Sequence, residues 1–354
     1  MTGRKPGKAI AMISGGLDST LALAMVRAQG VEVKAVTFYT GFCITETQRR
    51  KGGRQDGSMP QNEALRAAAD LDVDVEYVDI SGQAYLDMLL NPRYGYGANA
   101  NPCVDCRIFM MKKAKAIMEA EGADFIFTGE VLGQRPKSQR RDTLWAIERE
   151  SGLKGRLVRP LSAKLLEPSI PELEGILDRE KLGDISGRGR TRQIKLANEM
   201  GLLEWPQPAG GCCFLTDEAF SRKFFDVIGQ QEAAGQEKRL AQADIVLLTV
   251  GRHFRLSPTA KLIVGRTEVE NGVLETYAEG RARLLAARRN GPIGLVEGEP
   301  TWEERQLAAR IVARYGKGKD DAQVEIEWRD ADGAVEVFAV SPERDEARLE
   351  AIRI

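Results

Sequence analysis

The first feature with chemical potential is a short segment of glycine, serine and aspartate that follows an apolar run. Residues 8–13 (KAIAMI) lead directly into Ser14-Gly15-Gly16-Leu17-Asp18-Ser19. Adjacent glycines permit a tight turn whose backbone N–H groups converge, and the N-terminus of a following helix adds partial positive charge. The serine hydroxyls add donors, and the aspartate suits a Mg²⁺ ion that bridges phosphates. Because the segment lacks the lysine of a Walker A loop and is not GxGxxG, it predicts a phosphate-binding loop of a different kind.

The counts of cysteine and histidine restrict the remaining chemistry. The chain has five cysteines, too few and too unevenly placed for a disulfide scaffold, and the odd count favours metal, cluster or redox chemistry. Its one histidine, His253, nearly excludes a His-based zinc hydrolase or a Ser-His-Asp triad, because only this residue could act as the histidine general base.

Four of the cysteines lie in two polar turns. Cys103 and Cys106 form a C-x-x-C turn at the start of an expected helix, whose dipole favours thiolate. Cys212 and Cys213 follow two glycines further along the chain. A four-thiolate zinc site, an iron–sulfur cluster held by three cysteines and a redox pair of two cysteines all stay open. For Cys43 alone, a buried structural thiol is favoured.

A basic stretch is the third candidate. Residues 133–195 contain 15 Lys and Arg against 9 Asp and Glu, although the net charge of the whole chain is -1. The excess indicates either an ordinary solvated surface or a track for a polyanion. The second interpretation assigns phosphate contacts to Arg135, Lys137, Arg140, Arg188, Arg190 and Arg192.

The elements that must position these residues alternate between strand and helix. Strands are expected at residues 8–13, 31–39, 73–80, 123–129 and 155–162, with helices at 20–29, 61–70 and 106–121. Such alternation predicts βαβ units and a parallel sheet covered on both faces, with ligands at the carboxyl ends of the strands. We therefore expect an α/β nucleotide-binding domain over residues 1–165.

Beyond that domain the pattern changes twice. Residues 166–240 are expected to form a helical connecting region that carries the second cysteine segment. Residues 241–354 are expected to form a smaller α+β domain with strands at 243–251, 260–265, 322–330 and 334–341. A helix is predicted over 301–315, with Thr301 as N-cap and Glu304 in a capping box. Asp332 and Gly333 predict a hairpin between the last two strands.

Composition and hydropathy narrow the cellular setting. The 354-residue chain is 43% hydrophobic and 29% charged, an ordinary mix for a folded protein. It has no apolar run near the roughly 18 residues that span a bilayer, and its first residues do not form a signal peptide. We therefore expect a cytoplasmic protein with no membrane partner.

Several motifs resemble those of one enzyme superfamily. SGGLDS (14–19) resembles the pyrophosphate loop of the PP-loop ATP pyrophosphatases, which cleave ATP to AMP and pyrophosphate. NPCVDC (101–106) and GGCCFLTDEAF (210–220) resemble the two cysteine segments of tRNA 2-thiouridylases. TGEVLGQRPKSQ (128–139) and ISGRGRTRQ (185–193) are similar to segments of a thiolase subgroup.

This resemblance implies a fold, cofactors and site residues. The fold is the PP-loop (adenine nucleotide alpha-hydrolase-like) α/β domain, and the cofactors are ATP and Mg²⁺. The ATP-binding residues would be Ser14, Gly15, Gly16, Asp18, Ser19, Thr37, Phe38 and Gly129. The catalytic residues would be Asp18, Cys106 and Cys213.

The extra cysteine in the first segment resembles the cluster-dependent tRNA thiolases. It implies that Cys103, Cys106 and Cys213 hold a 4Fe-4S cluster with one open iron, with Cys212 as an alternate ligand. The rival route needs two thiols, a persulfide on Cys213 and a resolving Cys106. The sequence leaves both routes open.

The last domain has a resemblance of its own. GRHFRLSPTAKLIVGRTEVENGVLE (251–275) resembles the RNA-binding domain that ends the NFACT proteins of ribosome quality control. Five of its residues could contact phosphates: Arg252, His253, Arg255, Lys261 and Arg266.

Together these resemblances imply ATP-dependent thiolation of a tRNA uridine. The implied partners are tRNA and a sulfur donor, either sulfide or a cysteine desulfurase relay, and a homodimer is allowed. One alternative is a PP-loop amidotransferase or ligase that acts on a small molecule. Another is a non-enzymatic RNA-binding quality-control factor with a decayed ATP site.

Overall fold

The computed structural model describes residues 6–43, 63–202 and 213–354. The chain divides into two compact units, Met1–Thr216 and Asp217–Ile354, and we describe each by itself. The boundaries expected from the sequence, after residues 165 and 240, stay predictions. Among the described residues, no helix is both long enough and apolar enough to cross a membrane.

A five-stranded sheet forms the centre of the first unit. Its strands are β1 (Lys8–Met12), β2 (Glu32–Tyr39), β3 (Val75–Asp79), β4 (Phe125–Thr128) and β5 (Leu157–Val158). Their order in the sheet is β3-β2-β1-β4-β5, and all four neighbouring pairs are parallel. The predicted parallel α/β fold is therefore confirmed.

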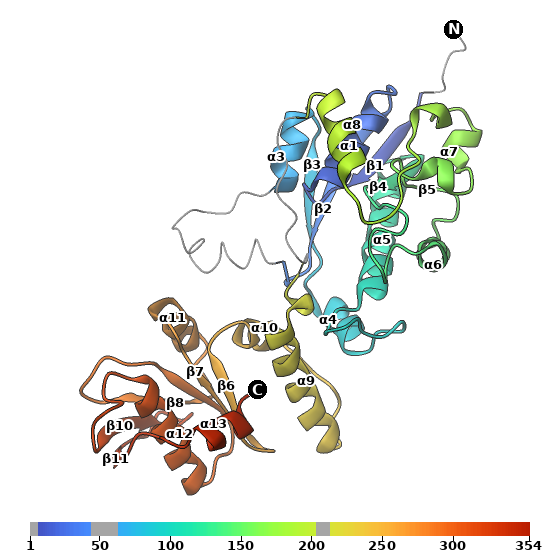
Figure 1. Ribbon diagram of the computed structural model, residues 1–354. Coiled ribbons are helices and arrows are strands. Elements are labelled where there is room, and N and C mark those ends of the chain that lie inside the picture. The colour runs from blue at the N-terminus through green and yellow to red at the C-terminus, as the bar shows by residue number, and fades with distance from the viewer. Residues whose placement is uncertain (1–5, 44–62, 203–212) are drawn as a thin grey trace. The chain divides into compact units, whose positions relative to one another are not determined.

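Helices cover both faces of this sheet (Figure 1). They are α1 (Leu17–Arg27), α3 (Glu63–Asp70), α4 (Gln83–Leu90), α5 (Cys103–Ala120), α6 (Arg141–Ser151), α7 (Ile170–Leu173) and α8 (Thr191–Glu199). Side chains alternate across a strand, so Ala9 and Ala11 of β1 pack in one core with α1 and α8. Ile10 and Met12 pack in a second core with α5 and α6.

Three predicted boundaries in this unit shift. The first helix begins at Leu17, three residues before its expected start, so Asp18 lies in its first turn. The helix expected from Cys106 begins at Cys103. The strand expected over 155–162 is only the pair Leu157–Val158, because Pro160 has no N–H to continue a ladder and the chain turns there.

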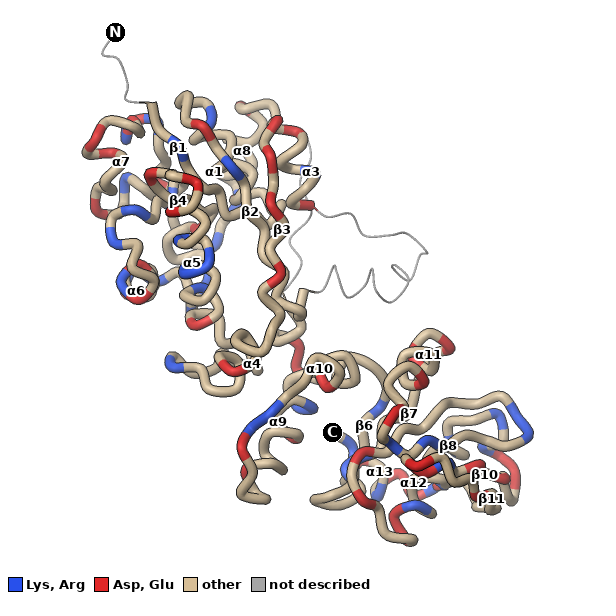
Figure 2. The backbone as a smooth tube through the Cα atoms, turned by 180° about the vertical axis from the view of Figure 1, so that it is seen from behind, with Lys and Arg blue, Asp and Glu red and all other residues tan. Residues whose placement is uncertain are grey.

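The second unit holds a six-stranded antiparallel sheet. Its strands are β6 (Arg252–Ser257), β7 (Ala260–Val264), β8 (Ala282–Ala286), β9 (Gly294–Gly298), β10 (Val324–Arg329) and β11 (Val335–Val340). Their order is β11-β10-β8-β9-β7-β6. The helices are α9 (Glu218–Ala233), α10 (Gln242–Leu248), α11 (Glu268–Thr276), α12 (Trp302–Tyr315) and α13 (Glu346–Ile352). In Figure 2, basic and acidic residues are interspersed along this unit.

Local sequence signals in the second unit succeed in two places and fail in one. The Thr301–Glu304 capping box begins α12, and the hairpin of β10 and β11 turns at Gly333, whose φ is +91°. The strand predicted over 243–251 is wrong, since its apolar residues form α10. A short apolar run does not distinguish helix from strand, and here the Asp244 carboxylate accepts the Ala241 N–H at 2.7 Å and begins a helix.

Candidate active site

The glycine-serine loop lies between β1 and α1, at the carboxyl edge of the parallel sheet. The Ser14 N–H donates to the Ser19 hydroxyl at 3.3 Å, and that hydroxyl donates to the Gly16 carbonyl at 2.9 Å. Gly15 has a φ of +75°, and a Cβ there would lie 2.1 Å from the carbonyl carbon of Glu63, so only glycine fits. The N-cap, Gly16, has no side chain to occupy the first-turn amides of α1. The loop therefore presents backbone donors at a helix N-terminus, as an anion requires.

This loop lies at the topological switch point of the sheet. The chain proceeds from β1 to β2 and β3 on one side and returns to β4 and β5 on the other, which leaves a crevice at the carboxyl ends of β1 and β4. Gly129 directly follows β4, and a Cβ on it would lie 2.4 Å from the Ser19 nitrogen. Gly129 therefore packs on the first turn of α1. Thr37 and Phe38, also predicted to bind ATP, lie near the carboxyl end of β2.

Asp18 is the most constrained group of the loop. Its side chain is 13% exposed, and its Oδ2 accepts the Gln134 amide at 3.0 Å and lies 3.7 Å from the Arg190 guanidinium. Burial raises the pKa of Asp18, while the hydrogen bond from Gln134 and the charge of Arg190 oppose the rise. Its Oδ1 is buried and has no hydrogen-bond partner among the described residues. An unpaired carboxylate oxygen beside two serine hydroxyls fits a hard cation such as Mg²⁺.

Helix α8 supplies a second unpaired group beside Asp18. Gln193 is completely buried, and neither amide atom of its side chain has a hydrogen-bond partner in the described part of the chain. Its amide faces the Asp18 carboxyl without a regular hydrogen bond, and the donor character of the amide lowers the pKa of Asp18. Buried amides without partners cost folding free energy, so this amide is suited to a ligand that completes its hydrogen bonds.

The six predicted basic residues have different surroundings. Arg190, at the N-terminus of α8, lies against Asp18, and Arg135 and Arg188 are exposed. Lys137 donates to the carbonyls of Gly95, at 2.9 Å, and Tyr96, so it supports that loop. Their RNA-binding role stays a prediction for all six residues.

The remaining two of these arginines contact carboxylates. Arg192 pairs with the Asp184 carboxylate and donates to its carbonyl at 3.1 Å. Arg140 lies 3.7 Å from Asp142 and, with Tyr94 and Val104, lines a cavity of about 430 Å³. Both arginines are exposed, so water competes with these pairs.

The thiols of the C-x-x-C turn are held from different sides. Cys103 begins α5 and accepts a hydrogen bond from the Asn101 amide at 3.2 Å. Cys106, in the first turn, accepts one from the Tyr85 hydroxyl at 3.2 Å. Tyr85 lies on α4 and is 1% exposed, and this burial, together with Cys106, raises its pKa well above 10.0. Tyr85 therefore acts as a donor to the Cys106 sulfur.

The second cysteine segment packs against the first. The Asn99 amide donates to the Thr216 carbonyl at 2.7 Å, and the Thr216 hydroxyl donates to the Cys213 carbonyl at 2.8 Å. Cys213 is close enough to Tyr85 to influence its pKa. Cys43, beyond the end of β2, forms an isolated antiparallel bridge with Cys213. Cys212 lies outside the described residues.

The cysteines do not form a ready cluster site in the described part of the chain. All four described cysteines are half-buried thiols. Within residues 6–43, 63–202 and 213–354, no three His, Cys, Asp or Glu side chains are arranged to hold a metal ion. The 4Fe-4S cluster that the resemblance implied on Cys103, Cys106 and Cys213 therefore stays a prediction.

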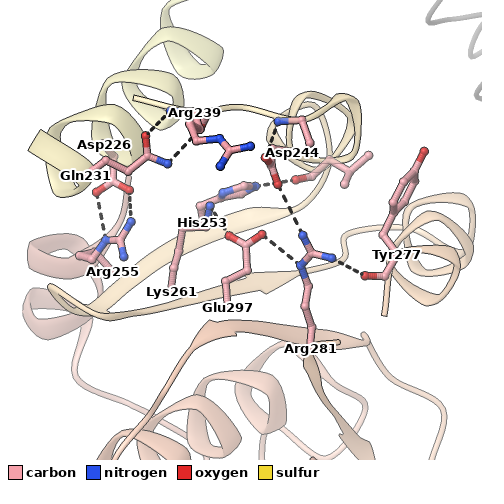
Figure 3. Close-up of polar contacts among 12 residues, drawn as sticks. Asp226, Gln231, Arg239, Asp244, His253, Arg255, Lys261, Tyr277, Arg281 and Glu297 are labelled. Atoms are coloured by element: carbon pink, nitrogen blue, oxygen red, sulfur yellow. Dashed lines mark hydrogen bonds and ion pairs between the residues drawn. The ribbon is translucent and has the colours of Figure 1, made fainter. Parts of the chain in front are cut away.

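The basic residues expected to bind phosphate in the second unit are engaged within the unit (Figure 3). Lys261 is buried and pairs with Glu297 at 2.6 Å, across β7 and β9. Arg255 pairs with Asp226, donating from Nε at 3.1 Å. His253 is 1% exposed, and burial lowers its pKa well below 6.5. Lys261 and His253 therefore belong to the folded interior, whereas Arg255 is half-buried in its pair with Asp226.

The other two basic residues of that segment are also in contact with neighbours. Arg266 pairs with Glu270 at 2.6 Å, one helical turn along the chain. The guanidinium of Arg252 lies 4.4 Å from the centre of the Tyr315 ring. The phosphate-binding role of these residues stays a prediction.

Sequence reasoning missed four residues of the first unit's site. Gln134 and Gln193 lie inside segments that the sequence singled out, but only the glycines and basic residues of those segments were chosen. Tyr85 lies in a helix with no motif, and Cys43 was expected to be structural. A search for polar residues of low expected exposure near the glycine loop could have found the two glutamines.

Comparisons with known proteins find one family match in each of the two compact units of the chain. Residues 5–164 match the family model of the thiamine biosynthesis protein (ThiI), and residues 251–351 match that of the NFACT protein RNA binding domain. The resemblances drawn from the sequence, to PP-loop tRNA thiolases and to the NFACT domain, are confirmed. The family matches cover separate parts of the chain.

Two curated relatives and one solved structure extend these matches. The tRNA-specific 2-thiouridylase MnmA of Syntrophotalea carbinolica is 32% identical over 33% of this chain and 32% of its own length. The tRNA-specific 2-thiouridylase MnmA 1 of Syntrophus aciditrophicus is 25% identical over 86% of this chain and 79% of its own length. A crystal structure of a 4-thiouridine synthetase–RNA complex with bound ATP is 20% identical, with a TM-score of 0.33, over 55% of this chain and 52% of that chain.

Proposed function

We propose that this chain, which joins a ThiI-type PP-loop domain to an NFACT-type RNA-binding domain, uses ATP to replace a uridine oxygen of tRNA with sulfur. One observation carries the proposal. The loop at Asp18 follows the carboxyl end of β1, and Cys213 forms a bridge with Cys43 beyond the carboxyl end of the neighbouring strand β2. A phosphate-binding loop explains activation by ATP, and paired thiols explain sulfur transfer.

The first step is adenylation of the uridine. A carbonyl oxygen is a poor leaving group, so it first attacks the α-phosphate of ATP and pyrophosphate departs. The first-turn amides of α1 stabilise the charge that develops on pyrophosphate. Asp18, with its unpaired Oδ1, would hold a Mg²⁺ ion that supplies charge neutralisation. Arg190, 3.7 Å from Asp18, is placed to contact the same phosphates.

The second step is sulfur transfer. A thiolate is the natural carrier because sulfur is nucleophilic at neutral pH. The proposed thiols are Cys106, stabilised by the Tyr85 hydroxyl, and Cys213. A 4Fe-4S cluster on Cys103, Cys106 and Cys213 stays the alternative route. We assign the transfer to a persulfide on Cys213, because that residue lies opposite a second cysteine, Cys43. The sulfur donor proposed for this route is a cysteine desulfurase relay, which hands over sulfur already at the oxidation level of a persulfide. Sulfide, the other donor that the sequence allowed, would suit only the cluster route.

The third requirement is a tRNA whose uridine can reach the site. The base must leave its stack, at a cost of about a few kcal/mol. The exposed Arg135 and Arg188 would hold the backbone beside the site, and the NFACT-type unit would add further RNA contacts. A homodimer and a cytoplasmic location are also proposed. Two observations favour thiolation over the alternative functions. An ammonia-dependent ligase would not need the paired cysteine segments, and a protein with a decayed ATP site would not need to keep an Asp18 oxygen unpaired.

The test combines tRNA chemistry with an ATP readout. tRNA from a strain that lacks the gene is incubated with the full-length protein, ATP, Mg²⁺ and a sulfur donor, and its nucleosides are then measured by mass spectrometry. We expect one uridine to gain sulfur and pyrophosphate to form in equal amount. Pyrophosphate release that depends on a small-molecule acceptor and not on tRNA would favour the ligase and overturn the proposal.

A further inference from the structure

Cys43 and Cys213 lie directly opposite each other in an isolated antiparallel bridge. The Phe214 N–H donates to the Phe42 carbonyl at 3.0 Å, so the backbone bond runs between the residues that flank the cysteines. Cys43 and Cys213 are therefore a non-hydrogen-bonded pair, the closer of the two pair types, with Cα atoms typically about 4.5 Å apart. That spacing lies within the range of about 4.4–6.8 Å found for disulfide-linked residues.

The segments around these two thiols are anchored from both sides. Phe42 is 1% exposed and packs against the Tyr85 ring at 6.0 Å between centres. The Asn99 amide holds Thr216, which in turn holds the Cys213 carbonyl. The Thr40 hydroxyl lies 3.8 Å from the Cys43 sulfur. The register that opposes the thiols is thus fixed by packing and by hydrogen bonds to neighbouring residues.

We propose that Cys43 is the thiol that resolves a persulfide on Cys213, through a reversible Cys43–Cys213 disulfide. The proposal rests on the thiolation function above. It assigns the resolving role away from Cys106, whose sulfur already accepts the Tyr85 hydroxyl, and from Cys103, whose sulfur accepts the Asn101 amide. The Cys43 sulfur also has a partner, the Thr40 hydroxyl at 3.8 Å, but its backbone already lies opposite Cys213 in the bridge.

The chemistry balances in two bond exchanges. The terminal sulfur of the Cys213 persulfide bonds to the activated uridine carbon, and the C–O bond to AMP breaks with its electron pair on AMP. The Cys43 thiolate, its proton lost to solvent, then attacks the Cys213 sulfur. A Cys43–Cys213 disulfide forms, and the bond to the transferred sulfur breaks, leaving its electron pair on the thiouridine.

The exchange has a redox consequence. The transferred sulfur is reduced and the two thiols are oxidised to a disulfide, so each turnover consumes a dithiol reductant of the thioredoxin class. The sulfur itself comes from a persulfide carrier. Without a reductant, the enzyme is expected to stop after one turnover with Cys43 and Cys213 joined.

The experiment uses full-length protein in which Cys212 is replaced by Ser, so that the two neighbouring thiols cannot be confused. The persulfide is loaded with a cysteine desulfurase and cysteine, and excess thiol is removed. ATP and tRNA are added, and peptides are analysed by mass spectrometry without reduction. We expect a peptide that joins Cys43 to Cys213 and depends on ATP. A Cys106–Cys213 peptide in its place would overturn the proposal.

The variant Cys43→Ser gives a second readout. Its pyrophosphate burst should persist, since adenylation precedes sulfur transfer, but free thiolated tRNA should be lost. The tRNA should instead stay attached to Cys213 and be released by added dithiothreitol. The assignment would be contradicted if Cys43→Ser released thiolated tRNA without a reductant and the tRNA adduct on Cys213 appeared in Cys106→Ser instead.

A third measurement separates this proposal from the function on which it rests. The resting protein is treated with a mild thiol oxidant in the absence of ATP and tRNA. Formation of the Cys43–Cys213 disulfide supports the pairing even where no uridine is thiolated, which would overturn only the proposed function. Thiolation by wild-type protein with no Cys43–Cys213 disulfide under either condition would overturn only the pairing.

Discussion

The Asp18 site of the first unit and the basic residues after position 250 in the second unit differ in how far their polar groups are paired within the fold. In the first unit, the Asp18 carboxylate keeps one buried oxygen without a partner among the described residues, and the Gln193 amide beside it is similarly unpaired. In the second unit, Lys261, Arg255 and Arg266 each pair with a carboxylate of the same unit. The first arrangement leaves hydrogen-bonding capacity for a ligand, and the second uses it within the fold.

The difference shows that a basic cluster in a sequence can form ion pairs within the fold, so the cluster alone does not identify a ligand surface. Whether basic side chains remain available to a ligand depends on whether the fold places similarly buried carboxylates beside them. Glu297 lies opposite Lys261 on the neighbouring strand and also lies 3.4 Å from Arg281 (Figure 3). The unpaired oxygen of Asp18 is therefore a stronger indication of function than the basic segment after residue 250.

The largest effect expected is at Asp18. Replacing Asp18 with Asn removes the charge of the unpaired oxygen while keeping the shape, and tRNA-dependent pyrophosphate release should fall about 10³-fold. Stability should change little, because burial already disfavours the charged carboxylate. Pyrophosphate release and thermal unfolding of the same preparation measure both.

The matched control for this change is an exposed carboxylate of the same unit. Asp87→Asn, on α4, removes a carboxylate that accepts the Gln83 amide at 2.8 Å one helical turn away, and it should leave pyrophosphate release within about twofold. Equal pyrophosphate release by the Asp18 and Asp87 variants would show that the Asp18 carboxylate does not act on a ligand.

The next largest effect is expected at the buried pair of the second unit. Glu297→Gln leaves the Lys261 ammonium, 5% exposed, without its partner, and should cost about 3 kcal/mol of unfolding free energy. Hydrogen exchange of peptides from β7 and β9, followed against urea, measures the loss. Glu336→Gln, at an exposed position of β11, is the control and should cost less than about 0.5 kcal/mol.

A double variant sharpens this result. Lys261→Met combined with Glu297→Leu replaces both charges by apolar side chains and should recover most of the loss, since neither charge is left buried alone. If the double variant is no more stable than Glu297→Gln, the ion pair contributes to stability beyond the mutual neutralisation of two buried charges.

The parts of this molecule that the sequence predicts are local. The turn at Gly15, the capping box at Thr301 and the hairpin at Gly333 depend on the backbone preferences of a few adjacent residues, and the structure has all three. The alternation that predicts the parallel sheet is also a local pattern, repeated along the chain. The run at residues 243–251 failed because its length suits either a short helix or a strand.

The parts that could not be predicted join distant segments. Asp18 meets Arg190 because α8 packs on α1, and Cys43 meets Cys213 because residues 213–216 pack beside the end of β2. Lys261 appears basic in the sequence and is neutralised only by a neighbouring strand. Pairing of this kind depends on tertiary packing, so residue type and spacing do not reveal it.

A smaller effect is expected in the pH dependence of the second unit's stability, because its one histidine is buried. His253 is the chain's one histidine, and its pKa is well below 6.5 because it is buried, with Lys223 and Lys261 nearby. The unfolded chain therefore binds a proton below pH 6.5 that the folded unit does not. Stability is complete above that pH and should fall on acidification by up to about 1.4 kcal/mol per pH unit. Hydrogen exchange of β6 between pH 7.5 and 5.5 measures the slope, which His253→Gln should flatten.

The smallest effect expected concerns salt, and it bears directly on the contrast between the units. Arg135→Gln combined with Arg188→Gln should reduce the slope of log affinity for tRNA against log salt by about one unit for each phosphate that the protein no longer binds. Arg255→Gln combined with Arg266→Gln removes the same charge from residues that the fold already pairs, so its slope should match that of wild type. Filter binding from low to moderate salt measures both, with hydrogen exchange to establish that each variant is folded. A reversed pattern, with the slope reduced only by the second pair, would place the RNA contact on the second unit and would show that its ion pairs open to admit phosphates.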